Sequence, residues 1–350
     1  MEQNRIVITG GCGFIGSNFI RAISQNNNFH ILNIDKLSYA GNLSTTKDFK
    51  DNKNYTFTQL DIKDRNKVEK EIMNFKPNFI INFAAESHVD RSIDSSLDFI
   101  NTNIIGTFNL LEIIRLYLKQ KNIPNFRFLH ISTDEVFGSI ELDHKFTEFS
   151  PYSPSSPYSA SKASSDHLVR AWHKTYNLPV IITNCSNNYG PFQFPEKLVP
   201  ITIINALLNK TINVYGDGQQ IRDWIHVNDH IEALQEILFN GKIGETYNIG
   251  GINEIKNIDL VNKVCEILDH LRPLSNSNTY KDQIEFVTDR PGHDLRYAID
   301  ISKIKNDLKW YPKTKFDSGL LDTVKWYLNN FEWCEEVTLG KYDFERLGKI

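Results

Sequence analysis

The chain has 350 residues, of which 40% are hydrophobic and 23% are charged, a composition typical of soluble globular proteins. Its net charge of −4 provides no basic surface for nucleic acid, and no apolar stretch approaches the roughly 20 residues that cross a bilayer. Cys12, Cys185, Cys265 and Cys334 are too scattered for a zinc site or a disulfide framework. Because no signal-peptide pattern begins the chain, we expect a cytoplasmic protein without nucleic-acid or membrane partners.

Short apolar runs alternate with helical hydrophobic patterns through the first two-thirds of the chain. The apolar runs predict strands over residues 5–9, 30–34, 55–59, 79–83, 127–132 and 180–183. The patterns between them predict helices over residues 14–24, 65–74, 97–119 and 158–176. Because such alternation produces parallel strands covered on both faces, we expect an α/β fold with a Rossmann-type, doubly wound parallel sheet.

The alternation stops after about residue 184, where Pro191, Pro195 and Pro200 interrupt the pattern. A helix over 227–238 and a strand over 245–249 indicate a return to the sheet, and further helices are expected over 258–268 and 316–329. We therefore predict an NAD-binding Rossmann domain over 1–184 with a return segment near 227–250. A smaller mixed α/β C-terminal lobe for the substrate would comprise 185–226 and 251–350.

A glycine-rich segment joins the first predicted strand to the first predicted helix. Gly10, Gly13 and Gly16 have GxxGxxG spacing, and Phe14 and Ile15 lie between the last two glycines. Glycine allows a tight turn and lets backbone N–H groups approach a pyrophosphate, while the helix N-terminus adds a favourable dipole. A bare turn also needs glycine, but the strand–turn–helix context favours a dinucleotide site.

Acidic residues follow the second and third predicted strands. Asp35 lies 19 residues after Gly16, where a carboxylate can accept hydrogen bonds from an adenosine ribose and would repel a 2′-phosphate. This position favours NAD over NADP, although the adjacent Lys36 weakens the preference. Asp61 and Ile62 come after the third strand, and we expect them at the adenine.

Tyr158 and Lys162 form a YxxxK pair, whose spacing places both side chains on one face of a helix. An ammonium group one turn from a phenol favours the phenolate, so we predict that Lys162 lowers the pKa of Tyr158 from about 10. Such a tyrosine can take a proton from a sugar hydroxyl near neutral pH. Surface pairs share this spacing, so the motif gains its meaning from the glycine loop that precedes it.

Asp134 and Glu135 follow the fifth predicted strand, and ligands of open α/β sheets bind outside the carboxyl ends of the strands. Two neighbouring carboxyl groups in different environments can divide into a protonated acid and an ionised base. The structural alternative is that they cap a helix N-terminus. Their place between the glycine loop and the YxxxK pair favours the catalytic interpretation.

Together these motifs resemble the extended short-chain dehydrogenases/reductases, and among them the dTDP-glucose 4,6-dehydratases, over nearly the whole chain. The resemblance rests on TGGCGFIG (9–16), DKLSYAGN (35–42), FAAESHVDRS (83–92), STDEVFG (132–138), SPYSASKASSDHLVRAW (156–172), NNYGPFQFPEKLVP (187–200), YGDGQQIRDWIHVNDH (215–230) and DRPGHDLRYAID (289–300). The glycine and YxxxK motifs mark only the superfamily, whereas the Thr-Asp-Glu triplet marks the dehydratase branch. Phe137 stands where tyrosine is common, and we expect little effect from the missing hydroxyl.

The resemblance implies a nucleotide-sugar substrate, a bound NAD cofactor and a reaction in three stages: oxidation at C4, loss of water across C5 and C6, and hydride return to C6. Tyr158 would take the 4-hydroxyl proton, with Thr133 at the 4-oxygen and Lys162 at the nicotinamide ribose. Glu135 would remove the C5 proton, and Asp134 would protonate the departing 6-hydroxyl. The family also implies a homodimer formed by the helices near 97–119 and 158–176.

The resemblance assigns further residues around the two ligands. Ala84 and Ala85 would leave space for the cofactor, Ser87 would face the sugar, and His88 is interpreted as a packed histidine. The residues implied at the nucleotide tail are Asn188, Glu196, Lys197, Arg222, Asn257, Arg290 and His293. Arginine and lysine suit a diphosphate because their hydrogen bonds to phosphate are charge-assisted.

Three alternatives stay open at this point. A UDP-glucose 4,6-dehydratase would use the same catalytic residues, because the base of the nucleotide is held far from the reacting carbons. A UDP-hexose 4-epimerase would need the hydride step but not the acid–base pair of Asp134 and Glu135. A catalytically inactive dinucleotide-binding protein would be expected to lack Tyr158 or Lys162, and both are present.

Overall fold

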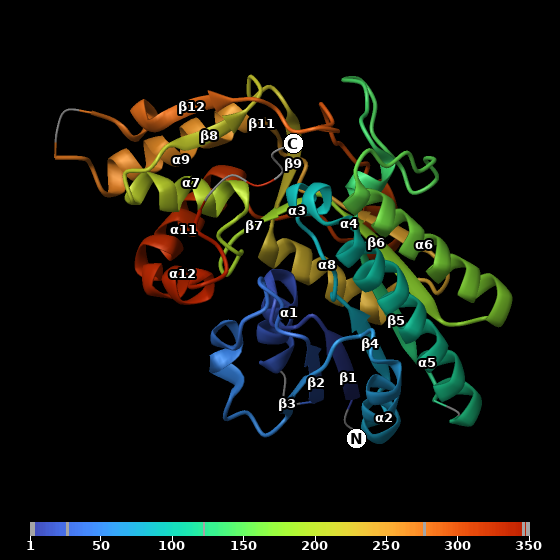
Figure 1. The fold of residues 1–350 in the computed structure, drawn as a ribbon. Coiled ribbons are helices and arrows are strands. Elements are labelled where there is room, and N and C mark those ends of the chain that lie inside the picture. Colours follow the sequence, from blue (N-terminus) through green and yellow to red (C-terminus); the bar gives the residue numbers. More distant parts are fainter. Residues whose placement is uncertain (1–3, 26–27, 122, 276–277, 345–346, 348–350) are drawn as a thin grey trace.

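The computed structural model describes residues 4–25, 28–121, 123–275, 278–344 and 347. Its centre is a seven-stranded parallel sheet with the strand order β10-β6-β5-β4-β1-β2-β3 (Figure 1). The strands are β1 (Asn4–Thr9), β2 (Phe29–Asp35), β3 (Tyr55–Gln59), β4 (Phe79–Asn82), β5 (Arg127–Thr133), β6 (Val180–Cys185) and β10 (Thr246–Ile249). The chain order switches between β1 and β4, the point at which doubly wound sheets bind their ligands.

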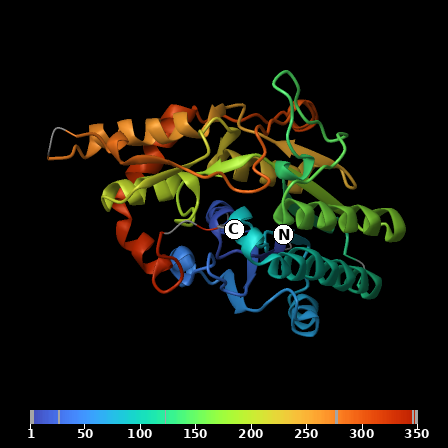
Figure 2. The ribbon, with the colours of Figure 1, turned by 45° about the horizontal axis from the view of Figure 1, so that its top comes forward.

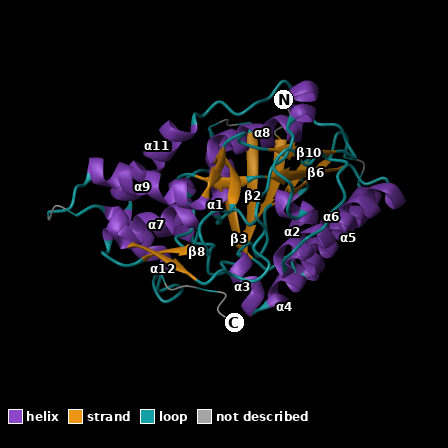
Figure 3. Ribbon diagram, turned by 90° about the horizontal axis from the view of Figure 1, so that it is seen from above, coloured by secondary structure: helices purple, strands orange, loops and turns teal. Residues whose placement is uncertain are grey.

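Helices cover both faces of this sheet (Figures 1 and 3). The helices α2 (Arg65–Phe75), α5 (Thr107–Gln120) and α6 (Pro157–Tyr176) lie side by side on one face, and α1 (Phe14–Ser24) and α8 (Val227–Asn240) lie on the other. The alternation of strand side chains explains this arrangement. Ile6 and Ile8 of β1 pack in the core beneath α1 and α8, whereas Val7 packs in the core beneath α2 and α5. The predicted doubly wound α/β fold is confirmed.

A second lobe lies above the carboxyl ends of the sheet strands (Figures 1 and 2). It contains the sheet β11-β9-β7 and the strand pair β12-β8. The strands of the lobe are β7 (Asn187–Tyr189), β8 (Ile212–Tyr215), β9 (Ile221–His226), β11 (Glu254–Lys256) and β12 (Ile284–Val287). Its helices are α7 (Leu198–Leu207), α9 (Asn257–Leu271), α11 (Phe316–Asn329) and α12 (Phe331–Thr338). In the parts of the chain that the structure covers, no helix combines the length and the apolar character needed to span a membrane.

The remaining α-helices of the described residues are short. The helices α3 (Val89–Asp94) and α4 (Ser96–Phe99) follow β4, and α10 (Ser302–Leu308) packs against β10 and α8. The sequence predicted one continuous helix over 97–119, but a π-helical turn over Ile100–Gly106 separates α4 from α5. The sequence also missed α7, because Pro200 argued against a helix there. Pro200 occupies the first turn of α7, where its missing N–H needs no partner within the helix.

Candidate active site

Two adjoining cavities lie at the carboxyl ends of the sheet strands. The sheet cavity is bounded by the glycine loop, the ends of β2, β4 and β5, and α6. The lobe cavity continues from it between α3 and the second lobe. The two cavities share Glu135, Asn187, Asn188, Gln193, Glu196 and Lys197. A ligand that fills both would therefore reach from the glycine loop into the second lobe.

The structure brings the sequence-predicted residues together in these two cavities. The cofactor, catalytic and sugar residues all line the sheet cavity, namely Gly10, Gly13, Phe14, Ile15, Gly16, Asp35, Lys36, Asp61, Ile62, Ala84, Ala85, Ser87, Thr133, Asp134, Glu135, Tyr158 and Lys162. The residues predicted at the nucleotide tail all line the lobe cavity, namely Asn188, Glu196, Lys197, Arg222, Asn257, Arg290 and His293. Their roles remain predictions.

The glycine loop has the geometry of a dinucleotide cradle. Gly10 has a φ of +72°, and a Cβ placed there would lie 2.6 Å from the backbone nitrogen of Ala84. A Cβ at Gly16 would lie 2.5 Å from the carbonyl oxygen of Gly10. The loop leads into α1, whose N-cap is Gly13, and no side chain among the described residues caps this end. Its backbone N–H groups and dipole are thus available to a pyrophosphate.

Asp35 is fixed at the end of β2 before any ligand arrives. Its Oδ2 accepts a hydrogen bond from the backbone N–H of Cys12 at 2.9 Å, and its Oδ1 accepts one from Leu37 at 2.8 Å. A carboxylate has lone pairs left to accept the hydroxyls of a ribose. Lys36 forms an ion pair with Glu86 at 2.6 Å, so its charge is balanced and does not favour a 2′-phosphate.

Tyr158 lies in the first turn of α6, and the local sequence explains why the helix starts there. Ser156 and Ser159 form a capping box, and Pro157 occupies the first helical position. The Tyr158 ring is buried and contacts the edge of Phe99, with ring centroids 6.2 Å apart. These contacts fix the phenol in the wall of the sheet cavity.

The prediction that Lys162 lowers the pKa of Tyr158 is wrong for this structure. Burial raises the pKa of Tyr158 well above 10, the negative charge of Glu135 raises it further, and a hydrogen bond with Thr133 opposes the shift. Lys162 donates from Nζ to the carbonyl oxygen of Ile131 at 2.7 Å, and its own pKa is lowered by burial. The expected effect of the ammonium group is therefore smaller than the cost of placing a phenolate in a buried site beside a carboxylate.

Asp134 and Glu135 follow directly from the end of β5. Thr133 is the N-cap of the short 3₁₀ turn Asp134–Phe137, and its Oγ1 accepts the Glu135 N–H at 3.3 Å. The carboxyl groups therefore do not serve as the cap, and the structural alternative is excluded. Within the described residues, Oδ2 of Asp134 is buried without a hydrogen-bond partner.

The two carboxyl groups have different environments. Burial, followed by the neighbouring charges of Glu135 and Asp223, raises the pKa of Asp134 well above its usual value. Burial also raises the pKa of Glu135, but the cations Arg290, Lys197 and Arg222 oppose this shift. Asp134 is consequently the group that keeps its proton, and Glu135 is the group more easily ionised.

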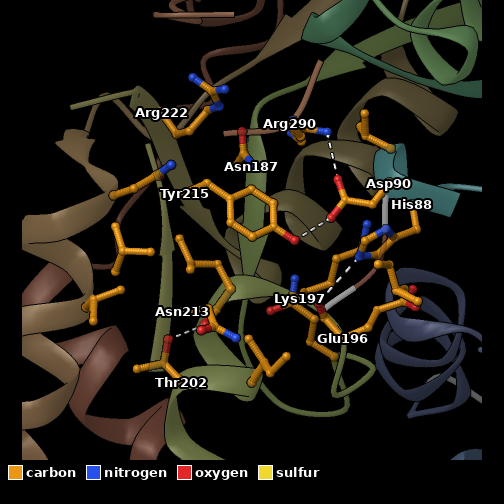
Figure 4. Close-up of a pocket in the computed structure, with 18 of the residues that line it drawn as sticks. His88, Asp90, Asn187, Glu196, Lys197, Thr202, Asn213, Tyr215, Arg222 and Arg290 are labelled. Atoms are coloured by element: carbon orange, nitrogen blue, oxygen red, sulfur yellow. Dashed lines mark hydrogen bonds and ion pairs between the residues drawn. The ribbon is translucent and has the colours of Figure 1, made fainter. Parts of the chain in front are cut away.

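Basic side chains gather in the lobe cavity (Figure 4). Arg222 donates to the carbonyl oxygens of Ile221 and Asp294, and its guanidinium lies 4.2 Å from the centre of the Tyr297 ring. Lys197 donates to the carbonyl oxygen of Ser87 at 2.8 Å. A carbonyl oxygen satisfies a donor without neutralising its charge, so both cations can still attract an anionic ligand.

Other residues of the lobe cavity have partners of their own. Glu196 forms an ion pair with Arg91 at 2.8 Å, and the Oδ1 of Asn188 accepts a hydrogen bond from the ring Nδ1 of His230 at 2.8 Å. Burial and the charge of Arg290 lower the pKa of His293 to about 4, so this imidazole is neutral at pH 7. The charge of Glu196 is therefore balanced by Arg91, and Asn188 and neutral His293 line the cavity without adding charge.

Sequence reasoning missed several residues that line the lobe cavity. Among them are Asp90, Asn187, Gln193, Tyr215 and Tyr297. All five fall inside motif segments that carry the family resemblance. Their segments were therefore recognisable, but the contact of Asp90 with Tyr215, which lies 125 positions away, leaves no local pattern.

The parallel sheet, the glycine loop and the YxxxK helix define a dinucleotide-binding enzyme of the extended short-chain dehydrogenase/reductase class. A family model described as GDP-mannose 4,6 dehydratase matches residues 7–323. The chain belongs to this family.

Several relatives of the chain are named dTDP-glucose 4,6-dehydratase. A dTDP-glucose 4,6-dehydratase of Neisseria meningitidis serogroup B is 54% identical over 352 residues, with 99% of both chains covered. A crystal structure of the Bacillus anthracis dTDP-glucose 4,6-dehydratase in complex with NAD has a TM-score of 0.85 and 44% identity, covering 95% of this chain and 99% of that one. The enzyme of that name from Streptomyces venezuelae, with NAD and TYD bound, has a TM-score of 0.86 and 40% identity, with the same coverage.

Proposed function

We propose that the chain converts dTDP-glucose to the 4-keto-6-deoxy sugar nucleotide, as an NAD-dependent hydro-lyase. The observation that carries this proposal is the pair Asp134 and Glu135, which line one cavity with Tyr158 and have unequal tendencies to hold a proton. An epimerase has no use for such a pair. The similarity to a dTDP-glucose 4,6-dehydratase, at 54% identity over 99% of the chain, supports dTDP as the nucleotide rather than UDP.

NAD fits the sheet cavity, because the glycine loop leaves no room for a Cβ and Asp35 stands where a ribose hydroxyl needs an acceptor. Gly10, Gly13, Gly16 and Asp35 would hold it. The chemistry that bound NAD would supply is transient storage of a hydride, taken from C4 of the hexose and returned at C6. The N-terminus of α1 would face the pyrophosphate.

Side chains of the protein accept and donate the protons of the reaction. Tyr158 takes the proton of the 4-hydroxyl as its phenolate, a form that the positive charge of a bound nicotinamide would favour against the raised pKa of the ligand-free site. Thr133 holds the 4-oxygen through its hydroxyl. Lys162 orients the nicotinamide ribose. Once C4 is a ketone, the C5 proton becomes acidic and Glu135 removes it. Asp134, which keeps its proton because it is buried, gives that proton to the 6-hydroxyl, which leaves as water.

The lobe cavity would hold the nucleotide tail. Lys197, Arg222 and Arg290 face this cavity and carry charges that suit a diphosphate. Asn257, the first residue of α9, also lines this cavity. Its Oδ1 is buried without a hydrogen-bond partner among the described residues. This acceptor would meet a donor on the substrate.

Turnover on two substrates tests the proposal. Purified protein incubated with dTDP-glucose should give a product with the ultraviolet absorbance of a 4-keto-6-deoxy sugar in alkali. UDP-glucose under the same conditions should react at least about tenfold more slowly, because each lost contact at a fitted base costs roughly 1–3 kcal/mol. Equal rates would leave UDP-glucose as a natural substrate, and a 4-epimer as sole product would contradict the dehydratase assignment.

We also propose that two copies associate through α5 and α6 into a four-helix bundle. Support comes from Leu97, Ile100 and Ile105, which precede α5 and are 64%, 45% and 44% exposed. Exposed apolar side chains grouped in this way are typical of an interface. Sedimentation velocity should therefore show a dimer, and a species of 40.5 kDa at micromolar concentration would contradict it.

The cytoplasm is the proposed location of this enzyme. All four cysteines are buried and unpaired, which suits a reducing compartment. Cell fractionation that recovers the protein outside the cytoplasm would contradict this proposal.

A further inference from the structure

Asp90 lines the lobe cavity and contacts Tyr215 and Arg290 there (Figure 4). It belongs to the short helix α3, which follows β4 of the central sheet. Its Oδ2 accepts a hydrogen bond from the hydroxyl of Tyr215 at 2.9 Å, and its Oδ1 pairs with the guanidinium of Arg290 at 3.2 Å. The Asp90 side chain is 9% exposed and the Arg290 side chain is 11% exposed. The mechanism proposed above makes no use of this carboxylate.

Arg290 differs from the other cations of the lobe cavity in its partner. Lys197 and Arg222 donate to backbone carbonyl oxygens, whereas Arg290 pairs with a carboxylate. A guanidinium has five donor hydrogens in a planar fork, and the bond from one terminal nitrogen to Asp90 leaves others for a second anion. The partner fixes the direction in which those remaining donors point.

We propose that Asp90 is a positioning residue, which holds Arg290 in the orientation that the diphosphate of the nucleotide sugar requires. Tyr215 supports it from β8 by donating to the second carboxylate oxygen. The inference rests on the proposed function, since it takes a diphosphate as part of the substrate. Because Asp90 already holds the Arg290 side chain in place, less conformational entropy would be lost when the substrate binds.

The charge of Asp90 and its proposed positioning role predict opposite changes in diphosphate affinity when Asp90 is lost. The charged groups that line the lobe cavity in the described residues are the cations Lys197, Arg222 and Arg290 and the anions Asp90, Glu135 and Glu196. Removing the charge of Asp90 makes the cavity more positive, so simple attraction should tighten the binding of a diphosphate. Positioning predicts weaker binding. The sign of the change therefore separates the two explanations.

The test compares the affinity of Asp90→Asn and of the parental protein for dTDP and for thymidine. Asparagine keeps the size of the side chain and an acceptor oxygen, but it loses the charge that holds the guanidinium. We expect dTDP to bind on the order of tenfold more weakly, which corresponds to one lost charge-assisted hydrogen bond. Thymidine, which lacks the diphosphate, should bind with unchanged affinity. In turnover, KM for dTDP-glucose should rise by a similar factor while kcat stays within about twofold.

A second variant and a matched control accompany this comparison. Tyr215→Phe removes the hydroxyl that supports the carboxylate and leaves every charge in place, so dTDP binding should weaken by about threefold. This variant also tests the proposal if Asp90→Asn does not fold. Asp94→Asn removes an exposed charge from the same short helix and should leave dTDP affinity unchanged. In an Arg290→Gln background, Asp90→Asn should change dTDP affinity by less than about twofold, because the two residues act as one unit.

Two outcomes would overturn the inference. Equal or tighter binding of dTDP to Asp90→Asn would show that the carboxylate only opposes the substrate. An equal loss of affinity for dTDP and thymidine would show a general distortion of the cavity. The proposed function is judged separately, by the turnover of the parental protein on dTDP-glucose, whereas the role of Asp90 is judged by the ratio between variant and parent.

Discussion

Tyr158→Phe should lower kcat on dTDP-glucose by about 10²- to 10⁴-fold, the usual contribution of a positioned proton acceptor. The variant keeps the ring that packs against Phe99, so its stability should be close to that of the parent. It loses the only atom of this side chain that can accept the 4-hydroxyl proton. The first oxidation should stop, and no absorbance of reduced nicotinamide should appear when substrate is added in a stopped-flow experiment.

Tyr176→Phe is the matched control for this experiment. Tyr176 is the last residue of the same helix, α6, and its side chain is 48% exposed. Its kcat should equal that of the parent. Reduced nicotinamide formed at the parental rate by Tyr158→Phe would mean that another group accepts the proton.

Glu135→Gln should separate oxidation from dehydration. Glutamine cannot remove the C5 proton, so the reaction should stop at the 4-keto hexose, and overall turnover should fall by about 10²- to 10⁴-fold. Reduced nicotinamide should still form and should then persist, because the acceptor at C6 is never produced. Quenched samples analysed by mass spectrometry should contain a dTDP-sugar two mass units lighter than the substrate, rather than the dehydrated product.

Glu141→Gln provides the control for a lost carboxylate. Glu141 is exposed in the loop that follows the same strand, and its replacement should change neither phase of the reaction. Dehydration by Glu135→Gln at the parental rate would show that the base is another residue. In that case the raised pKa of Asp134 would no longer identify it as the acid.

The central sheet could be predicted from the sequence because its strands are short, apolar and separated by clear breaks. The helix predicted over 14–24 matches α1, since a glycine loop defines its start and hydrophobic periodicity defines its length. The π-helical turn at Ile100–Gly106 could not be predicted, because the helical pattern of side chains continues through it. The helix α7 was hidden by Pro200, which is tolerated in the first turn of a helix.

The site could be predicted only in part from the sequence, for a different physical reason. Gly10, Asp134 and Tyr158 belong to short motifs whose spacing fixes their geometry within one loop or helix. The pKa of Tyr158 could not be predicted from its spacing to Lys162, because burial and Glu135 dominate it and both depend on the tertiary fold. Asp90 meets Arg290 across 200 positions of sequence, so their contact exists only once both lobes are in place.

The most direct test of the central claim follows hydrogen through one turnover. If Tyr158, Asp134 and Glu135 surround one hexose next to one bound NAD, dTDP-glucose that carries deuterium at C4 should give a product with deuterium at C6 of the same molecule. In D₂O, the unlabelled substrate should gain deuterium at C5, where the proton that Glu135 removes is replaced from solvent. Loss of the C4 label to water, or its appearance on the C6 of a different sugar molecule in a crossover experiment, would contradict the account.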